Sequence, residues 1–68
     1  MTADEFNAAF PVGTRVAAFP ITRDEQPLIT TTRTPAWALG HGVAVVAVDG
    51  YAGGIALTHI DVIEGAAA

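Results

Sequence analysis

The chain has 68 residues, a net charge of −4 and no cysteine, which excludes disulfides and thiolate zinc sites as sources of stability. Serine and lysine are also absent, so the side chains that most often act as activated nucleophiles are missing, and neither enzymatic activity nor a cofactor is expected. The three arginines are outnumbered by seven acidic residues, a balance that disfavours binding to nucleic-acid phosphates.

No secretory leader or transmembrane segment is expected. Residues 1–10 contain two acids and no basic residue, so they lack the charged and long apolar regions of a signal peptide. The longest uninterrupted apolar run, Val43 to Val48, is far shorter than the roughly 20 residues that span a bilayer. The 51% hydrophobic content favours a folded domain. We expect it in the cytoplasm, stabilised by good packing or by a homo-oligomer.

The first ten residues are predicted to form a short helix. Thr2 and Glu5 have the spacing of a capping box, in which each side chain bonds the other residue's backbone N–H. Phe6 and Phe10, four residues apart, lie on one face of such a helix. Pro11-Val12-Gly13 then predicts a turn that ends it.

Short strands and turns follow. Thr14–Phe19 alternates as a first strand, and Pro20–Pro27 is predicted to be a solvated loop because charged residues lie between two prolines. Leu28–Thr34 is threonine-rich and suits a strand with one wet face near a sheet edge. Pro35 interrupts it, and Ala36–Leu39 continues it or begins another strand.

The last third of the chain reads as a β-hairpin. Val43–Val48 and Ile55–Ile63 are apolar runs separated by the glycine-rich turn Asp49–Gly54. That turn resembles a phosphate-binding loop only in composition, because a strand-like segment rather than a helix follows it. The terminal residues 65–68 are predicted to be a loose tail.

Strand phases predict the core and a second buried face. The residues expected in the core are Val16, Leu39, Val45, Ile55 and Ile60. Within Val43–Val48 both phases are apolar, so both faces of this strand should be covered. The second cover is expected from the helix that carries Phe6 and Phe10, or from another chain.

The closing segment Gly53-Gly54-Ile55-Ala56-Leu57-Thr58-His59-Ile60 is similar to the part of SH3 domains where a strand passes through one 3₁₀ turn into the last strand. The resemblance implies an all-β, small five-stranded SH3-like barrel over residues 1–68, with the short N-terminal helix added. It also implies that Ile55 and Ile60 are core residues and that Leu57–His59 form the 3₁₀ turn.

The resemblance to SH3 domains does not imply that this chain binds polyproline peptides. Ala56 and His59 stand where SH3 domains have a proline and a tyrosine of their aromatic platform. His59 is instead expected to cover the 3₁₀ turn. The alanine-rich, lysine-free composition also resembles small uncharacterised proteins of high-GC bacteria and their phages.

Two aromatic residues are candidates for contact with a partner. Trp37 has the surface to anchor either the core or a contact surface, and in a domain this small the core is favoured. Tyr51 falls among small residues at a turn, where exposure and a contact role are expected.

Charged and metal-ligating candidates are fewer. Arg23, together with the other two arginines, could face an acidic partner, but pairing with the chain's own acids is the favoured interpretation. His59 and Asp61 share a face of an extended segment. No metal site is expected, because His41 lies between glycines in a turn and is predicted to be exposed.

These features favour a non-catalytic protein–protein interaction module that uses the Pro20–Pro27 loop and the Tyr51 turn. The resemblance to phage proteins implies a phage or mobile-element accessory protein acting on a partner in the host cytoplasm. The alternatives are a self-associating structural protein of the virion type and an SH3-like nucleic-acid-binding protein. The candidate partner-binding residues are Arg23, Asp24, Glu25, Trp37, Tyr51 and His59.

Overall fold

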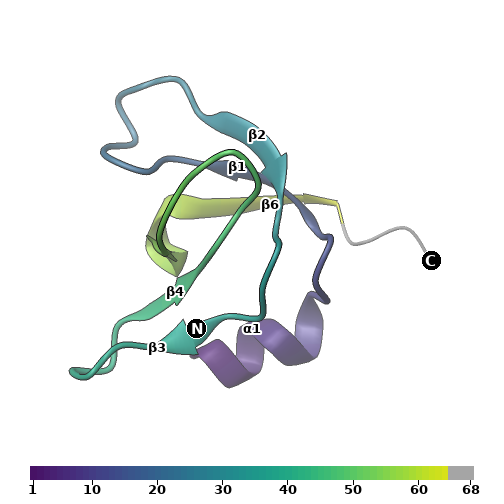
Figure 1. Ribbon diagram of the computed structural model, residues 1–68, viewed down its shortest axis with the longest axis vertical. Coiled ribbons are helices and arrows are strands. Elements are labelled where there is room, and N and C mark those ends of the chain that lie inside the picture. Colours follow the sequence, from purple (N-terminus) through teal and green to yellow (C-terminus); the bar gives the residue numbers. More distant parts are fainter. Residues whose placement is uncertain (65–68) are drawn as a thin grey trace.

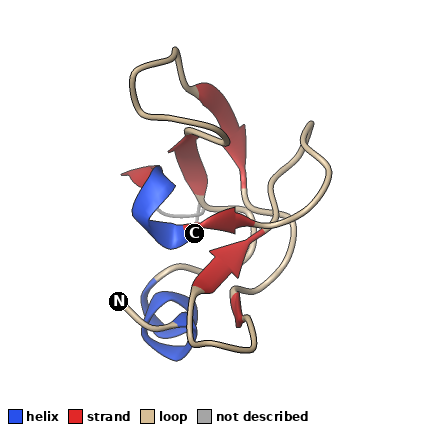
Figure 2. Ribbon diagram, turned by 90° about the vertical axis from the view of Figure 1, so that its left-hand side faces the viewer, coloured by secondary structure: helices blue, strands red, loops and turns tan. Residues whose placement is uncertain are grey.

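Strands dominate the computed structural model, which describes residues 1–64; the tail expected at 65–68 lies outside them. One short helix precedes the strands and lies at one end of the molecule (Figure 1, Figure 2). The elements are α1 (Ala3–Ala9), β1 (Arg15–Ala18), β2 (Leu28–Thr31), β3 (Trp37–Ala38), β4 (Ala44–Val46), β5 (Ile55–Ala56), the 3₁₀ turn η1 (Leu57–His59) and β6 (Ile60–Glu64).

The strands form two antiparallel sheets, with the orders β2-β1-β6 and β3-β4-β5. The predicted hairpin is confirmed, since β4 pairs antiparallel with β5 and Val46 lies opposite Ile55. A small all-β fold with one helix is therefore correct. The expected count of five strands is wrong, because Trp37–Ala38 forms a separate strand that pairs with β4, whereas β2 pairs with β1. Within residues 1–64 the two sheets do not close into a barrel.

Strand β4 is shorter than the predicted Val43–Val48 because the chain leaves β5 after Val46. The Ala47 carbonyl accepts the Arg33 backbone N–H at 3.0 Å, and the Asp49 N–H donates to the Thr31 carbonyl at 3.0 Å. An isolated bridge between Thr32 and Val48 lies between these bonds. The segment after β4 thus turns toward the end of β2 and links the two sheets.

The helix forms as predicted and docks on its own chain. Thr2 Oγ1 accepts the Glu5 N–H at 3.1 Å, and Glu5 Oε1 accepts the Thr2 N–H at 2.8 Å, which completes the capping box. The Thr2 backbone bond is the larger cause that lowers the pKa of the Glu5 carboxyl. Asn7 then clamps the helix to the segment before β3, donating to the Ala36 carbonyl at 2.9 Å and accepting its N–H at 2.7 Å.

The core lies between the sheets and the helix. Four of the five predicted core residues are buried, but Leu39 is 43% exposed and that prediction is wrong. Leu39 begins the tight turn between β3 and β4, where its N–H donates to the Val43 carbonyl, and this turn projects beyond the core. The buried cluster comprises Phe6, Val16, Ala18, Ala36, Val46, Val48, Ile55 and Ile60.

Both faces of β4 are covered, as its two apolar phases predict. Val46 is fully buried in the same cluster as Phe6, and the next residue back, Val45, is 5% exposed on the opposite face. Trp37 is the cross-strand partner of Val45. Trp37 therefore covers the face of β4 that carries Val45. The helix was expected to cover this outer face, but through Phe6 it covers the inner face that carries Val46.

Gly54 lies against the side chains of Val45 and Trp37, so adding a side chain at Gly54 tests how closely they pack. A Cβ added there would lie 2.8 Å from Val45 Cγ2 and 3.1 Å from two atoms of the Trp37 ring. We expect Gly54→Ala to lower the free energy of unfolding by about 1–3 kcal/mol, since overpacking displaces neighbours. Urea denaturation measures this.

Gly40→Ala is the matched control, because a Cβ at Gly40 meets no atom within 4 Å. Its effect should stay within about 0.5 kcal/mol. Equal stability of the Gly54 and Gly40 variants would contradict the packing of Trp37 over Val45.

Candidate functional site

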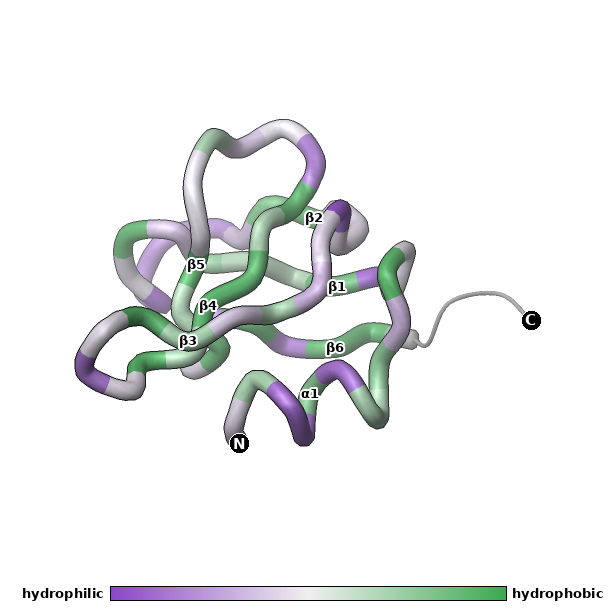
Figure 3. Tube along the Cα trace, turned by 60° about the horizontal axis from the view of Figure 1, so that its bottom comes forward, coloured by the Kyte–Doolittle hydropathy of each residue, from purple (hydrophilic) through white to green (hydrophobic). Residues whose placement is uncertain are grey.

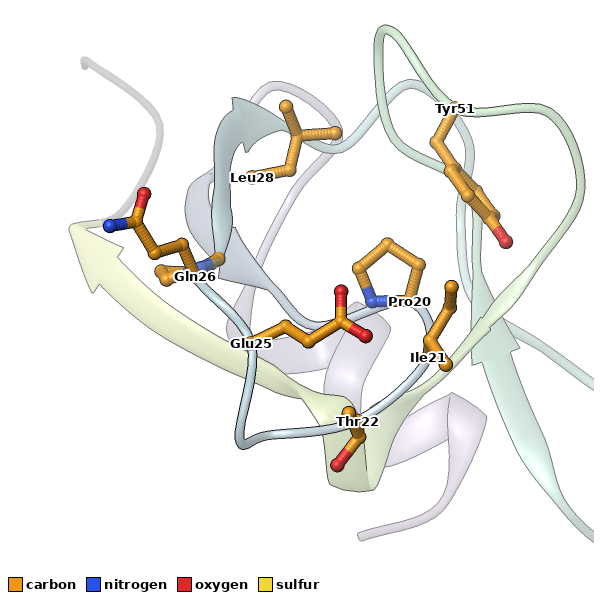
Figure 4. Close-up of a pocket in the computed structure, with 8 residues that line it drawn as sticks. Pro20, Ile21, Thr22, Glu25, Gln26, Leu28 and Tyr51 are labelled. Atoms are coloured by element: carbon orange, nitrogen blue, oxygen red, sulfur yellow. The ribbon is translucent and has the colours of Figure 1, made fainter.

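A pocket of about 420 Å³ opens between the loop that joins β1 to β2 and the loop that joins β4 to β5 (Figure 4). The two loops meet although they are more than twenty positions apart in the chain. They are the two segments that the sequence interpretation selected for partner contact. The lining residues are Pro20, Ile21, Thr22, Glu25, Gln26, Pro27, Leu28 and Tyr51.

The Tyr51 side of the pocket is held by hydrogen bonds to β2. Asp49 makes these bonds: its carbonyl accepts a hydrogen bond from Thr30 Oγ1 at 2.8 Å, and its Oδ2 accepts one from Thr31 Oγ1 at 3.0 Å. Gly50 follows with a φ of +85°, a conformation that favours glycine and reverses the chain. Tyr51 is thereby presented at the mouth of the pocket, 37% exposed as expected for a turn residue.

The other side of the pocket is held by Arg23. Its guanidinium makes two bonds to Asp61, both 2.9 Å, and two to the Thr58 carbonyl, at 3.0 and 2.7 Å. It also lies 5.0 Å from the centre of the Phe19 ring, a cation–π distance. The pairing of an arginine with the chain's own acid is confirmed here. Arg23 therefore positions the loop, its side chain being engaged within the chain.

The ion pair shifts the pKa of both partners. Hydrogen bonds from Arg23 lower the pKa of the Asp61 carboxyl, and the same bonds raise the pKa of Arg23. Because the folded pKa of Asp61 is depressed, the pair stabilises the loop above roughly pH 4, the ordinary aspartate range. That contribution is lost as the pH falls through the lower folded pKa.

We therefore expect the 20–27 loop to loosen in acid before the rest of the domain. The side-chain Nε–H signal of Arg23, followed by NMR between pH 6 and pH 2, should titrate with Asp61, because this guanidinium bonds the Asp61 carboxylate and the Thr58 carbonyl. Asp61→Asn should abolish this transition, and Asp4→Asn, an equal change of charge on the distant helix, should leave it in place. An unchanged acid transition in Asp61→Asn would show that another group holds the loop.

The remaining candidates lie elsewhere. Trp37 was favoured as a core residue, yet it is 41% exposed, because it covers the outer face of β4. The register places Leu39 and Val43 on the same face of this hairpin, and Figure 3 shows hydrophobic segments on both sides of its hydrophilic tip. His59 is half-buried at the end of η1 and does not line the pocket.

The histidines do not meet. His41 is exposed at the tip of the β3–β4 turn, as predicted. Over residues 1–63, no three side chains among His, Asp and Glu are grouped to hold a metal ion. The longest helix of the same region, α1, has seven residues, and none is long and apolar enough to cross a membrane.

Sequence reasoning missed the apolar lining of the pocket and a second hollow. Pro20, Ile21 and Leu28 were assigned only to a loop and a strand, although flanking prolines signal a shaped loop. The second hollow, of about 280 Å³, separates α1 from η1 and β6. Its residues are Met1, Phe6, Phe10, Leu57, Thr58, Ile60 and Val62.

Comparisons with known protein families, with curated proteins and with solved structures found no match to this chain.

Proposed function

We propose that this chain is a non-catalytic protein–protein interaction module and that its contact surface is the pocket between the 20–27 loop and Tyr51. The observation that carries the proposal is that two distant loops are each fixed by side-chain bonds and together present apolar surface to solvent. Ile21 at the rim is 73% exposed. Loops held on a rigid scaffold are where binding residues concentrate.

The 3₁₀ turn supports an SH3-like architecture for this module. It covers Leu57–His59 and joins β5 to β6, as the resemblance of the closing segment to SH3 domains implies. The pocket does not use Ala56 or His59, the positions of the aromatic platform, so the proposed contact is different from polyproline recognition.

A capture experiment with three forms of the full chain tests the proposal. Ile21→Asn replaces apolar surface at the rim of the pocket with a neutral amide, and Val12→Asn makes the same change at a residue that is 51% exposed in the turn after α1. Circular dichroism first establishes that both variants fold. The proposal expects a protein from the source extract that wild type and Val12→Asn retain and that Ile21→Asn loses.

Other results would contradict it. If Ile21→Asn retains the same proteins as wild type, this pocket is not the contact surface. If both variants lose the protein equally, a general loss of apolar surface explains the result. Light scattering of the wild-type chain separates a different partner from self-association.

A further inference from the structure

We propose that the pocket binds the cationic side chain of an arginine or lysine on the partner, with Glu25 as its counter-ion. This inference rests on the proposed function and adds the chemistry of the partner. It follows from the charge in the pocket, from the absence of an internal partner for that charge, and from the shape of the walls.

The first step is the charge. Glu25 is the carboxylate among the lining residues, whose other polar groups are the hydroxyls of Thr22 and Tyr51 and the amide of Gln26. In Figure 4 the Glu25 carboxylate points inward toward Pro20, whereas Gln26 points away. A single negative charge thus faces the interior of a largely apolar pocket.

The second step is that the nearby cations are occupied. Arg23 is engaged by Asp61 and the Thr58 carbonyl. Arg33 donates hydrogen bonds to the Val48 carbonyl at 2.9 Å and the Tyr51 carbonyl at 3.4 Å. It therefore bonds the backbone of the β4–β5 loop and does not pair with Glu25. Among the side chains of residues 1–63 the salt bridge is Arg23–Asp61. Glu25 therefore keeps its charge available to a partner.

The third step is the shape of the walls. Pro20, Ile21 and Leu28 offer apolar surface, and Tyr51 adds an aromatic ring on the side of the β4–β5 loop (Figure 4). Arginine and lysine carry an apolar stem and a charged head, and that head is attracted both to a carboxylate and to an aromatic ring. A purely apolar side chain would desolvate Glu25 without pairing it, which costs free energy.

The net charge of the whole chain also favours a cationic partner. The net charge is −4, and Asp24 adds a second exposed carboxylate next to Glu25. Such a surface attracts basic segments and repels acidic ones. The pocket is accordingly selective for the sign of the partner's charge.

The test titrates the full chain with four blocked pentapeptides while backbone amide shifts are followed by NMR. The peptides have alanine at four positions and Arg, Lys, Leu or Glu at the centre. We expect saturable shifts at residues 20–28 and 51 with the Arg and Lys peptides, weaker shifts with Leu and none with Glu. Glu25→Gln should weaken the Arg peptide about two- to fivefold, the size of an exposed ion pair.

Asp4→Asn is the matched control, since it removes the same charge from α1, which lies at the opposite end of the molecule from the loop between β1 and β2 (Figure 1). It should change the affinity less than twofold, roughly the effect of a screened distant charge. Equal weakening by both variants would show long-range attraction without a pocket site and would overturn the inference.

Two further outcomes separate this inference from the proposed function. If the Leu peptide binds as tightly as the Arg peptide and Glu25→Gln has no effect, the pocket prefers apolar side chains. The proposed cation site is then refuted, whereas the proposed interaction module is not. If no peptide shifts residues 20–28 or 51, the cation site is also refuted. The capture experiment with Ile21→Asn then decides the module independently.

Discussion

Replacing Phe6 with alanine is expected to lower the free energy of unfolding by about 3–5 kcal/mol, because a buried aromatic ring is removed and leaves a cavity. Phe6 is 3% exposed and is the side chain by which α1 joins the buried cluster. Its ring lies 5.2 Å from that of Phe10, tilted by 54°. Urea denaturation gives the loss of stability, and amide exchange should show residues 3–10 losing protection.

A domain of this size has little stability to spare, so a milder variant accompanies this one. Phe6→Leu should cost about 1–1.5 kcal/mol and keep the fold. Phe10→Ala serves as the control on the same helix face, since Phe10 is only partly buried against the cluster; its effect should be the smaller. A helix that stays protected in Phe6→Ala would contradict docking through Phe6.

Replacing Val46 with aspartate is expected to unfold the domain as a whole. Val46 has no exposed surface, and a carboxylate there would be buried without a partner, at a cost of at least about 3 kcal/mol. The sequence allowed Val46 on the outer phase of its strand, where this change would have released the helix or dissociated an assembly. The structure points Val46 inward, so circular dichroism and the one-dimensional NMR spectrum should both report loss of the fold.

Val43→Asp makes the identical substitution three residues earlier, at a valine that is 42% exposed. It should stay within about 1 kcal/mol of wild type, because its charge remains solvated. A folded Val46→Asp with wild-type chemical shifts would show that the inward phase of β4 is assigned wrongly.

Local features were determined by the sequence itself. The capping box needs only Thr2 and Glu5 at a spacing of three, because both of its hydrogen bonds close within one helical turn. The hairpin from β4 to β5 follows from two apolar runs around a glycine-rich turn. The 3₁₀ turn at Leu57–His59 lies where the SH3 resemblance places it.

The candidate site depended on non-local contacts. Arg23 is 38 positions from Asp61, and no spacing rule connects them. The Tyr51 turn reaches the 20–27 loop because Asp49 bonds to β2. Sequence reasoning selected both segments from their turn composition, yet it could not state that they line one pocket.

Non-local contacts also determined which apolar residues belong to the core. Val45 and Leu39 lie on one face of the β3–β4 hairpin, and strand alternation treats them alike. Val45 is buried because Trp37 lies opposite it and Gly54 lies against both side chains, whereas Leu39 is exposed in the turn after β3. Periodicity determines the face on which a side chain lies. Burial depends on which distant segment covers that face, and only the tertiary structure decides it.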